Sequence, residues 1–135
     1  MIRSILLIIA GVIALGCNSG DKTKDKNKIY LSKDKLNIAK LTDTLVINEN
    51  TCRGCAYEYS THFDIDDSLK IIKLDKIVTT DNNRSDVAGG TVNKDLFLVP
   101  VKLGSTKVKL YKYYNQKATA GDSSHYSVYS IEIKN

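Results

Sequence analysis

The sequence contains no hydrophobic run long enough to cross a membrane. Its long apolar stretch, residues 5–15, is about eleven residues and polar residues follow it directly, whereas a transmembrane helix needs about 20. Arg3 precedes this stretch and the small residue Gly16 follows it, which is typical of a secretory signal. Residues 1–16 are therefore predicted to be a signal peptide, and the mature chain is expected to be exported.

The patterns of several functional classes are also missing. No serine lies in the glycine pattern of a nucleophile elbow. Although the net charge is +5, no Lys/Arg cluster is interleaved with aromatic residues as on a surface that binds single strands. His62 and His125 stand alone in the sequence, so zinc would lack ligands. We expect a protein that is not an enzyme, needs no cofactor or metal and binds no nucleic acid.

Residues 14–17, Ala-Leu-Gly-Cys, resemble the lipobox of bacterial lipoproteins, with the leucine one place later than usual. The resemblance implies cleavage before Cys17 and lipidation of its thiol, which would anchor the protein to a membrane, in the periplasm or at the cell surface. An ordinary signal peptide with a chance cysteine is the alternative. Residues 17–28 are rich in lysine and lack large apolar residues, so a flexible tether is predicted. Its lysines could instead bind anionic lipid.

Residues 29–135 provide enough chain for one domain. Alternation of apolar and polar residues recurs with turn residues between the runs, and helical periodicity is scarce. Strands are predicted at residues 44–48, 56–61, 69–74, 94–103, 106–113 and 126–134. Within four of them, alternation places apolar residues together on one face: Leu45 and Ile47, Leu96 and Leu98, Val108 and Leu110, and Tyr129, Ile131 and Ile133, the last three inward. Gly104 and Ser105 are expected to form a hairpin, and Pro100 predicts an edge strand or a bulge. An all-β sandwich of about seven or eight strands is expected, but alternation alone does not separate an immunoglobulin-like sandwich from other small β folds.

Three segments lie at or between the ends of the predicted strands. The first contains Asn50, Thr51, Cys52, Arg53, Gly54, Cys55 and Tyr57. The second contains Ala88, Gly89, Gly90 and Thr91, and the third contains Tyr113, Tyr114, Asn115 and Gln116. In order and spacing they resemble the three binding loops of chagasin-type inhibitors of papain-like cysteine proteases. The resemblance covers most of residues 41–135.

The first loop of that family reads Asn-Pro-Thr-Thr-Gly, an aromatic residue, any residue and tryptophan. Asn50, Gly54 and Tyr57 match in register, while the Arg-Pro-Trp of the family's third loop is absent. The resemblance implies an immunoglobulin-like sandwich with the three loops at one end, the first lying over the catalytic thiol. A reversible inhibitor of a host or endogenous papain-like protease is expected. A non-inhibitory immunoglobulin-like surface lipoprotein for adhesion or assembly is the alternative.

Cys52 and Cys55 form a C-x-x-C motif. In an exported protein thiols oxidise, which favours a disulfide that closes a tight turn. A thioredoxin-like redox centre would instead require a helix in a βαβ unit, whereas strands are predicted on both sides. Asp64, Asp66 and Asp67 raise the possibility of a calcium site. Because the glycine and later glutamate of an EF-hand are missing, a solvated acidic turn is favoured.

Overall fold

The computed structural model describes residues 27–82, 89–114 and 126–135, which fold into β-strands. The strands are β1 (Lys28–Tyr30), β2 (Leu36–Lys40), β3 (Thr44–Cys52), β4 (His62–Asp66), β5 (Ile72–Thr80), β6 (Thr91–Pro100), β7 (Gly104–Tyr113) and β8 (Tyr126–Lys134). Within these residues, no helix has the length and apolar character of a membrane span.

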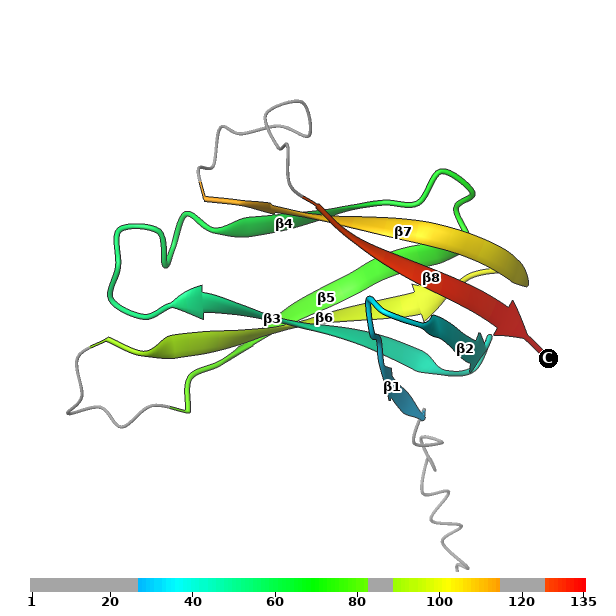
Figure 1. Cartoon of the computed structure of the whole chain (residues 1–135). Coiled ribbons are helices and arrows are strands. Elements are labelled where there is room, and N and C mark those ends of the chain that lie inside the picture. The colour runs from blue at the N-terminus through cyan, green and yellow to red at the C-terminus, as the bar shows by residue number, and fades with distance from the viewer. Residues whose placement is uncertain (1–26, 83–88, 115–125) are drawn as a thin grey trace, which may run out of the picture.

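The strands form two four-stranded sheets that pack as a sandwich (Figure 1). One sheet has the order β1-β3-β6-β5 and the other the order β2-β8-β7-β4. With the strands lettered A, A′, B, C, D, E, F and G along the chain, this is A-B-E-D against A′-G-F-C, the immunoglobulin arrangement. The predicted all-β, immunoglobulin-like sandwich is therefore confirmed.

The two N-terminal strands are the exceptions to antiparallel pairing. β1 pairs in parallel with β3, with Lys28 opposite Thr44, and β2 pairs in parallel with β8. The backbone N–H of Thr44 also donates to the carbonyl oxygen of Asn27 (2.9 Å). The first described residues therefore lie beside the start of β3.

The core fills the space between the sheets. Because successive side chains of a strand point to opposite faces, alternate apolar residues of each sheet meet there. The core includes Leu45 and Ile47 of β3, Leu96 and Leu98 of β6, Val108 and Leu110 of β7, and Tyr129, Ile131 and Ile133 of β8. The inward faces predicted from alternation in these four strands are correct.

The prediction of a hairpin at Gly104 and Ser105 is wrong. β6 and β7 belong to different sheets, so the chain crosses from one layer to the other at residues 101–103, which lie outside the strands. Pro100 is the last residue of β6, and β6 lies between β3 and β5 rather than at an edge. A proline at the end of a strand interrupts no further ladder bonds, so an interior strand tolerates it. The register shift in this sheet is in β5, at residues 74–76.

The strand predicted at residues 56–61 is also absent, and a series of turns replaces it. The N–H of Glu58 donates to the carbonyl oxygen of Cys55 (3.1 Å), and that of Thr61 donates to the carbonyl oxygen of Tyr57 (2.9 Å). These bonds give the segment a compact backbone in which Tyr57 and Tyr59 are both exposed. Alternation of tyrosines was therefore a misleading strand signal.

The turn between β4 and β5 is organised by Asp67, and β5 consequently begins at Ile72 rather than at residue 69. One carboxylate oxygen of Asp67 accepts from the N–H groups of Ile71 (2.6 Å) and Ile72 (2.7 Å). The other accepts from the N–H of Leu69 (3.1 Å) and the hydroxyl of Thr106 (2.5 Å). Burial by itself would raise the pKa of the Asp67 carboxyl, but these hydrogen bonds outweigh it and lower the pKa.

The expected solvated acidic turn is therefore wrong for Asp67, which is partly buried and bonded, whereas Asp64 and Asp66 are exposed. No group of three or more His, Cys, Asp or Glu side chains in the described part of the chain is arranged to hold a metal ion.

Candidate binding surface at one end of the sandwich

The strands β3, β5 and β7 finish at the same end of the sandwich, on the left of Figure 1, and three connections start there. We name them loop 1 (residues 53–61, between β3 and β4), loop 2 (residues 81–90, between β5 and β6) and loop 3 (residues 114–125, between β7 and β8), and their common position the loop end. The strand pairing fixes this arrangement, because Cys52 at the end of β3 pairs with Thr91 at the start of β6. In the other sheet, His62 at the start of β4 pairs with Tyr113 at the end of β7.

The structure thus brings together the described members of all three predicted segments. Asn50, Thr51 and Cys52 belong to β3 rather than to loop 1, and Thr51 is buried, so its side chain is not part of the surface. Outside the described residues lie Cys17, Ala88, Asn115, Gln116 and His125.

Loop 1 is joined to loop 2 through Arg53. Its backbone N–H donates to the carbonyl oxygen of Gly90 (3.0 Å). Its side-chain Nε donates to a carboxylate oxygen of Asp81 (2.8 Å), which forms an ion pair as well as a hydrogen bond. Asp81 was not predicted as a site residue, and its only sequence signal is an acidic side chain directly after a β-strand.

The predicted Cys52–Cys55 disulfide is present and closes the first turn of loop 1. Gly54, inside this turn, has a φ of +71°, which favours glycine. Apart from its two chain neighbours, no described residue would have an atom within 4 Å of an added Cβ there, so the positive φ rather than lack of space favours the glycine. The N–H of Gly54 donates to the carboxylate of Glu58 (2.5 Å), and the N–H of Tyr57 donates to Sγ of Cys55 (3.3 Å). Glu58 is a second supporting residue that sequence reasoning missed.

Loop 1 also contacts the beginning of loop 3. The rings of Tyr57 and Tyr114 meet edge to face, with centroids 5.8 Å apart. The hydroxyl of Ser60 donates to the carbonyl oxygen of Tyr114 (2.6 Å). Loop 1 is therefore bonded to described residues of both other loops, Asp81 and Gly90 of loop 2 and Tyr114 of loop 3.

Exposed tyrosines are the main apolar feature of the loop end. Tyr57 is 55% exposed, Tyr114 is 56% exposed and Tyr59 is 87% exposed. By contrast, Tyr113 is only 5% exposed and its ring stacks on that of His62. Of the two tyrosines predicted in the third segment, Tyr114 is thus available for contact and Tyr113 supports the fold. Tyr59 was not among the predicted site residues.

A cluster of charged side chains, Lys33, Glu49 and Lys112, lies next to the loop end. Lys112 lies 3.5 Å from the carboxylate of Glu49, which also lies 3.6 Å from Lys33. The ammonium group of Lys112 donates to the carbonyl oxygen of Asn50 and lies 5.9 Å from the centre of the Tyr114 ring. Burial, and then the charge of Glu49, raise the pKa of the neighbouring Tyr129 to about 12. Lys112 therefore joins the end of β3 to the start of loop 3.

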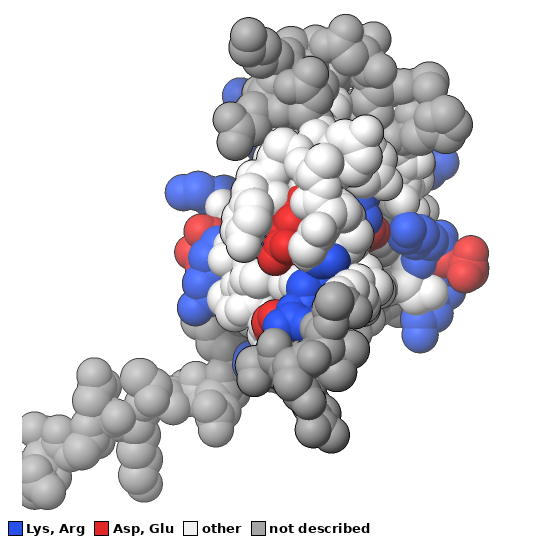
Figure 2. All heavy atoms as spheres, turned by 90° about the vertical axis from the view of Figure 1, so that its left-hand side faces the viewer, with Lys and Arg blue, Asp and Glu red and all other residues white. Residues whose placement is uncertain are grey.

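Figure 2 looks onto the loop end. Uncharged atoms predominate in the middle of its described surface, and basic and acidic side chains lie next to one another there. Further basic side chains project at the flanks. A low share of charged side chains at the centre is a feature of protein interfaces.

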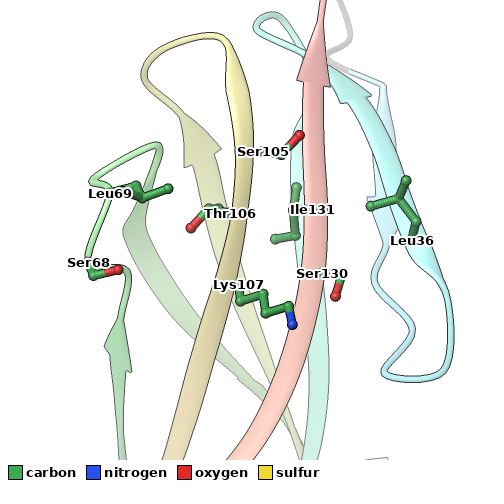
Figure 3. Close-up of a pocket in the computed structure, with 8 residues that line it drawn as sticks. All are labelled: Leu36, Ser68, Leu69, Ser105, Thr106, Lys107, Ser130 and Ile131. Atoms are coloured by element: carbon green, nitrogen blue, oxygen red, sulfur yellow. The ribbon is translucent and has the colours of Figure 1, made fainter.

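A pocket of about 530 Å³ lies toward the opposite end of the sandwich (Figure 3). Leu36 and Leu69 stand on its two sides, and Lys107 and Ser130 lie between them. Its remaining lining residues are Ser68, Ser105, Thr106 and Ile131. This lining contains no carboxylate, histidine or cysteine, so it offers no acid–base pair and no thiol nucleophile.

Comparison with known proteins identifies related folds. No protein-family model matches the chain, and no curated protein matches it. Among solved structures, the cysteine protease inhibitor EhICP2 from Entamoeba histolytica is similar, with a TM-score of 0.57 and 16% sequence identity over 80% of this chain and 95% of that chain. The solution structure of amebosin is similar with a TM-score of 0.52 and 12% identity, over 81% of this chain and 98% of that one. These likenesses establish that the chain has a sandwich fold that a cysteine protease inhibitor also adopts.

Proposed function

We propose that the protein is a reversible inhibitor of papain-like cysteine proteases that blocks the substrate cleft. One observation carries the proposal: the strands that lead into the three loops finish together at one end of a sandwich whose fold is shared with EhICP2, a cysteine protease inhibitor. The likeness spans 95% of that inhibitor's chain. Inhibition of this kind requires no catalytic group and no cofactor, because the inhibitor acts by occupying the cleft.

The contacts among the loops support this function. Loop 1 is bonded to loop 2 through Arg53 and to loop 3 through Ser60. A loop that is held by such bonds before it binds loses little entropy on association, and loop 1 is such a loop. Because loop 1 is bonded to residues of both other loops, we assign it to the deepest part of the cleft, nearest the catalytic thiol. Tyr57, Tyr59 and Tyr114 provide the aromatic surface that dominates many protein interfaces.

Titration of the purified mature chain against several active-site-titrated papain-like proteases tests the proposal. We expect competitive inhibition of peptide hydrolysis, recovery of activity on dilution and an uncleaved inhibitor. Lys107→Ala, in the pocket remote from the loops, serves as a control and should inhibit like the parent. Absence of inhibition and binding at micromolar concentration would contradict the proposal and favour the non-inhibitory surface lipoprotein.

We also propose that the protein is exported and anchored by a lipid on Cys17. The support is the consecutive order of apolar segment, lipobox-like sequence and lysine-rich stretch in residues 1–28. A Cys17→Ala variant should be recovered in the soluble exported fraction, whereas the parent should stay with membranes. Unchanged membrane retention of the variant would contradict the lipid anchor while leaving the inhibitor proposal intact.

A further inference from the structure

We propose that the Cys52–Cys55 disulfide accepts the catalytic thiolate of the target protease and forms a transient mixed disulfide with it. This inference rests on the proposed function, since it requires a cysteine protease docked on the loop end. A papain-like protease carries its nucleophile as a thiolate because a neighbouring histidine lowers the thiol pKa. Thiolates attack accessible disulfides, so the thiolate of a docked protease can react with the disulfide of loop 1.

The position of the disulfide makes it accessible to such a partner. It lies where β3 passes into loop 1, the loop that is bonded to both of the others. Both cysteines are partly exposed. Gly54, between them, has no side chain, and no described residue other than its two chain neighbours comes within 4 Å of the place where a Cβ would be. A group entering from the side of Gly54 therefore meets little obstruction.

A hydrogen bond to the sulfur of Cys55 indicates which sulfur is attacked. Sγ of Cys55 accepts from the N–H of Tyr57 (3.3 Å), and such a bond stabilises a thiolate at Cys55. A more stable thiolate is the better leaving group. The protease thiolate therefore attacks Sγ of Cys52, and the Cys52–Cys55 bond breaks. The released electron pair stays on Sγ of Cys55, which takes a proton from solvent.

This step needs no external oxidant. The protease thiol is oxidised to the mixed disulfide while Cys55 is reduced to a thiol, so the electrons balance within the complex. The reverse step, in which Cys55 attacks the mixed disulfide, restores the free protease thiol and the loop disulfide. Inhibition thus gains a covalent component that a reductant removes, in addition to the contacts of the three loops.

In the experiment, the mature chain and a papain-like protease freed of reductant are mixed in equal amounts. Excess N-ethylmaleimide then stops the reaction, because it alkylates the Cys55 thiol before this thiol can attack the mixed disulfide. Intact mass spectrometry should find a one-to-one adduct carrying one maleimide, which reduction dissociates. Peptide mapping should place the bond at Cys52. Adduct formation should be roughly 100-fold or more faster than with the same concentration of glutathione, because docking raises the effective concentration of the thiolate.

The matched control is the double variant Cys52→Ser with Cys55→Ser, which should form no adduct under the same conditions. Its inhibition should be weaker than that of the parent chain, because the disulfide no longer closes the first turn of loop 1. Inhibition by the parent chain without an adduct, or an adduct formed equally fast by glutathione, would overturn the covalent step and leave the proposed function standing. A bond at Cys55 would overturn the assignment of the leaving group. If neither inhibition nor an adduct is found, the proposed function itself is wrong.

Discussion

Replacement of Asp67 offers a direct test of the turn that links the two sheets. Its carboxylate accepts three backbone N–H bonds and one from the hydroxyl of Thr106. A hydrogen bond to a charged group contributes about 1.5–3 kcal/mol when buried. Because Asp67 is only partly buried, water can replace part of this network. We therefore expect Asp67→Ala to lower the free energy of unfolding by about 2–3 kcal/mol in total.

Urea unfolding at neutral pH measures this loss, and Asp66→Ala is the matched control. Asp66 lies one residue earlier and is exposed, so its removal should change stability by less than about 0.5 kcal/mol. Asp67→Asn should lie between the two, because the amide keeps one acceptor oxygen but loses the charge. Equal stabilities of the Asp67→Ala and Asp66→Ala variants would refute the role of the carboxylate.

The same network predicts a dependence on pH. The pKa of Asp67 is lowered in the folded state, so the unfolded chain takes up this proton first as the pH falls. The contribution of Asp67 is complete above the unfolded pKa of about 3.9 and is lost as the pH falls through the lower folded pKa. The stability difference between the parent and Asp67→Ala should therefore shrink in strong acid. A difference that stays constant down to the lowest pH at which both variants fold would contradict this reasoning.

Three further predictions concern the loop end. Arg53→Ala and Asp81→Ala should each weaken inhibition. If the ion pair of these two residues positions loop 1, the double variant should have the same inhibition constant as Arg53→Ala alone. Additive losses of binding free energy in the double variant would contradict this. Tyr114→Ala should weaken inhibition by about 1–2 kcal/mol without unfolding the domain, whereas Tyr113→Ala should lower its melting temperature; the reverse pattern would contradict the assignment. Gly54→Ala should weaken inhibition by about 1–2 kcal/mol, because a side chain strains the positive φ, and unchanged inhibition would show that the turn adapts.

Alternation of apolar and polar residues predicted several of the strands and their buried faces, but not which sheet each strand joins. Tyr129, Ile131 and Ile133 were predicted to face inward because alternation records which face of a strand is buried. The hairpin at Gly104 was wrong because local pattern does not reveal whether consecutive strands join the same sheet. The strand predicted at residues 56–61, which include Tyr57, was wrong because hydrogen bonds within the turns and the contact of Glu58 with Gly54 determine the backbone there.

The site was predictable where its residues are adjacent in sequence and not where distant segments meet. Gly54 and Tyr114 were found through the family resemblance. Asp81 was missed because its role depends on Arg53, which lies 28 residues earlier. Lys112 was missed for the same reason, since it bonds to Asn50 at a separation of 62 residues. The contact of Arg53 with Asp81 forms when β3, β6 and β5 have joined in one sheet, and the contact of Lys112 with Asn50 forms when the two sheets have packed together.

The parallel pairing of β1 with β3 has a mechanical consequence. Lys28 lies opposite Thr44, and β3 runs from there to Cys52, a length of about 26 Å at the usual rise per residue. A chain held at its N-terminus and gripped at loop 1 would thus be pulled along the strand axis. In this geometry the force acts on all the hydrogen bonds between β1 and β3 at once, in shear, so that they do not break one after another. A membrane-attached inhibitor built in this way would resist being peeled apart by a protease that moves away from the membrane.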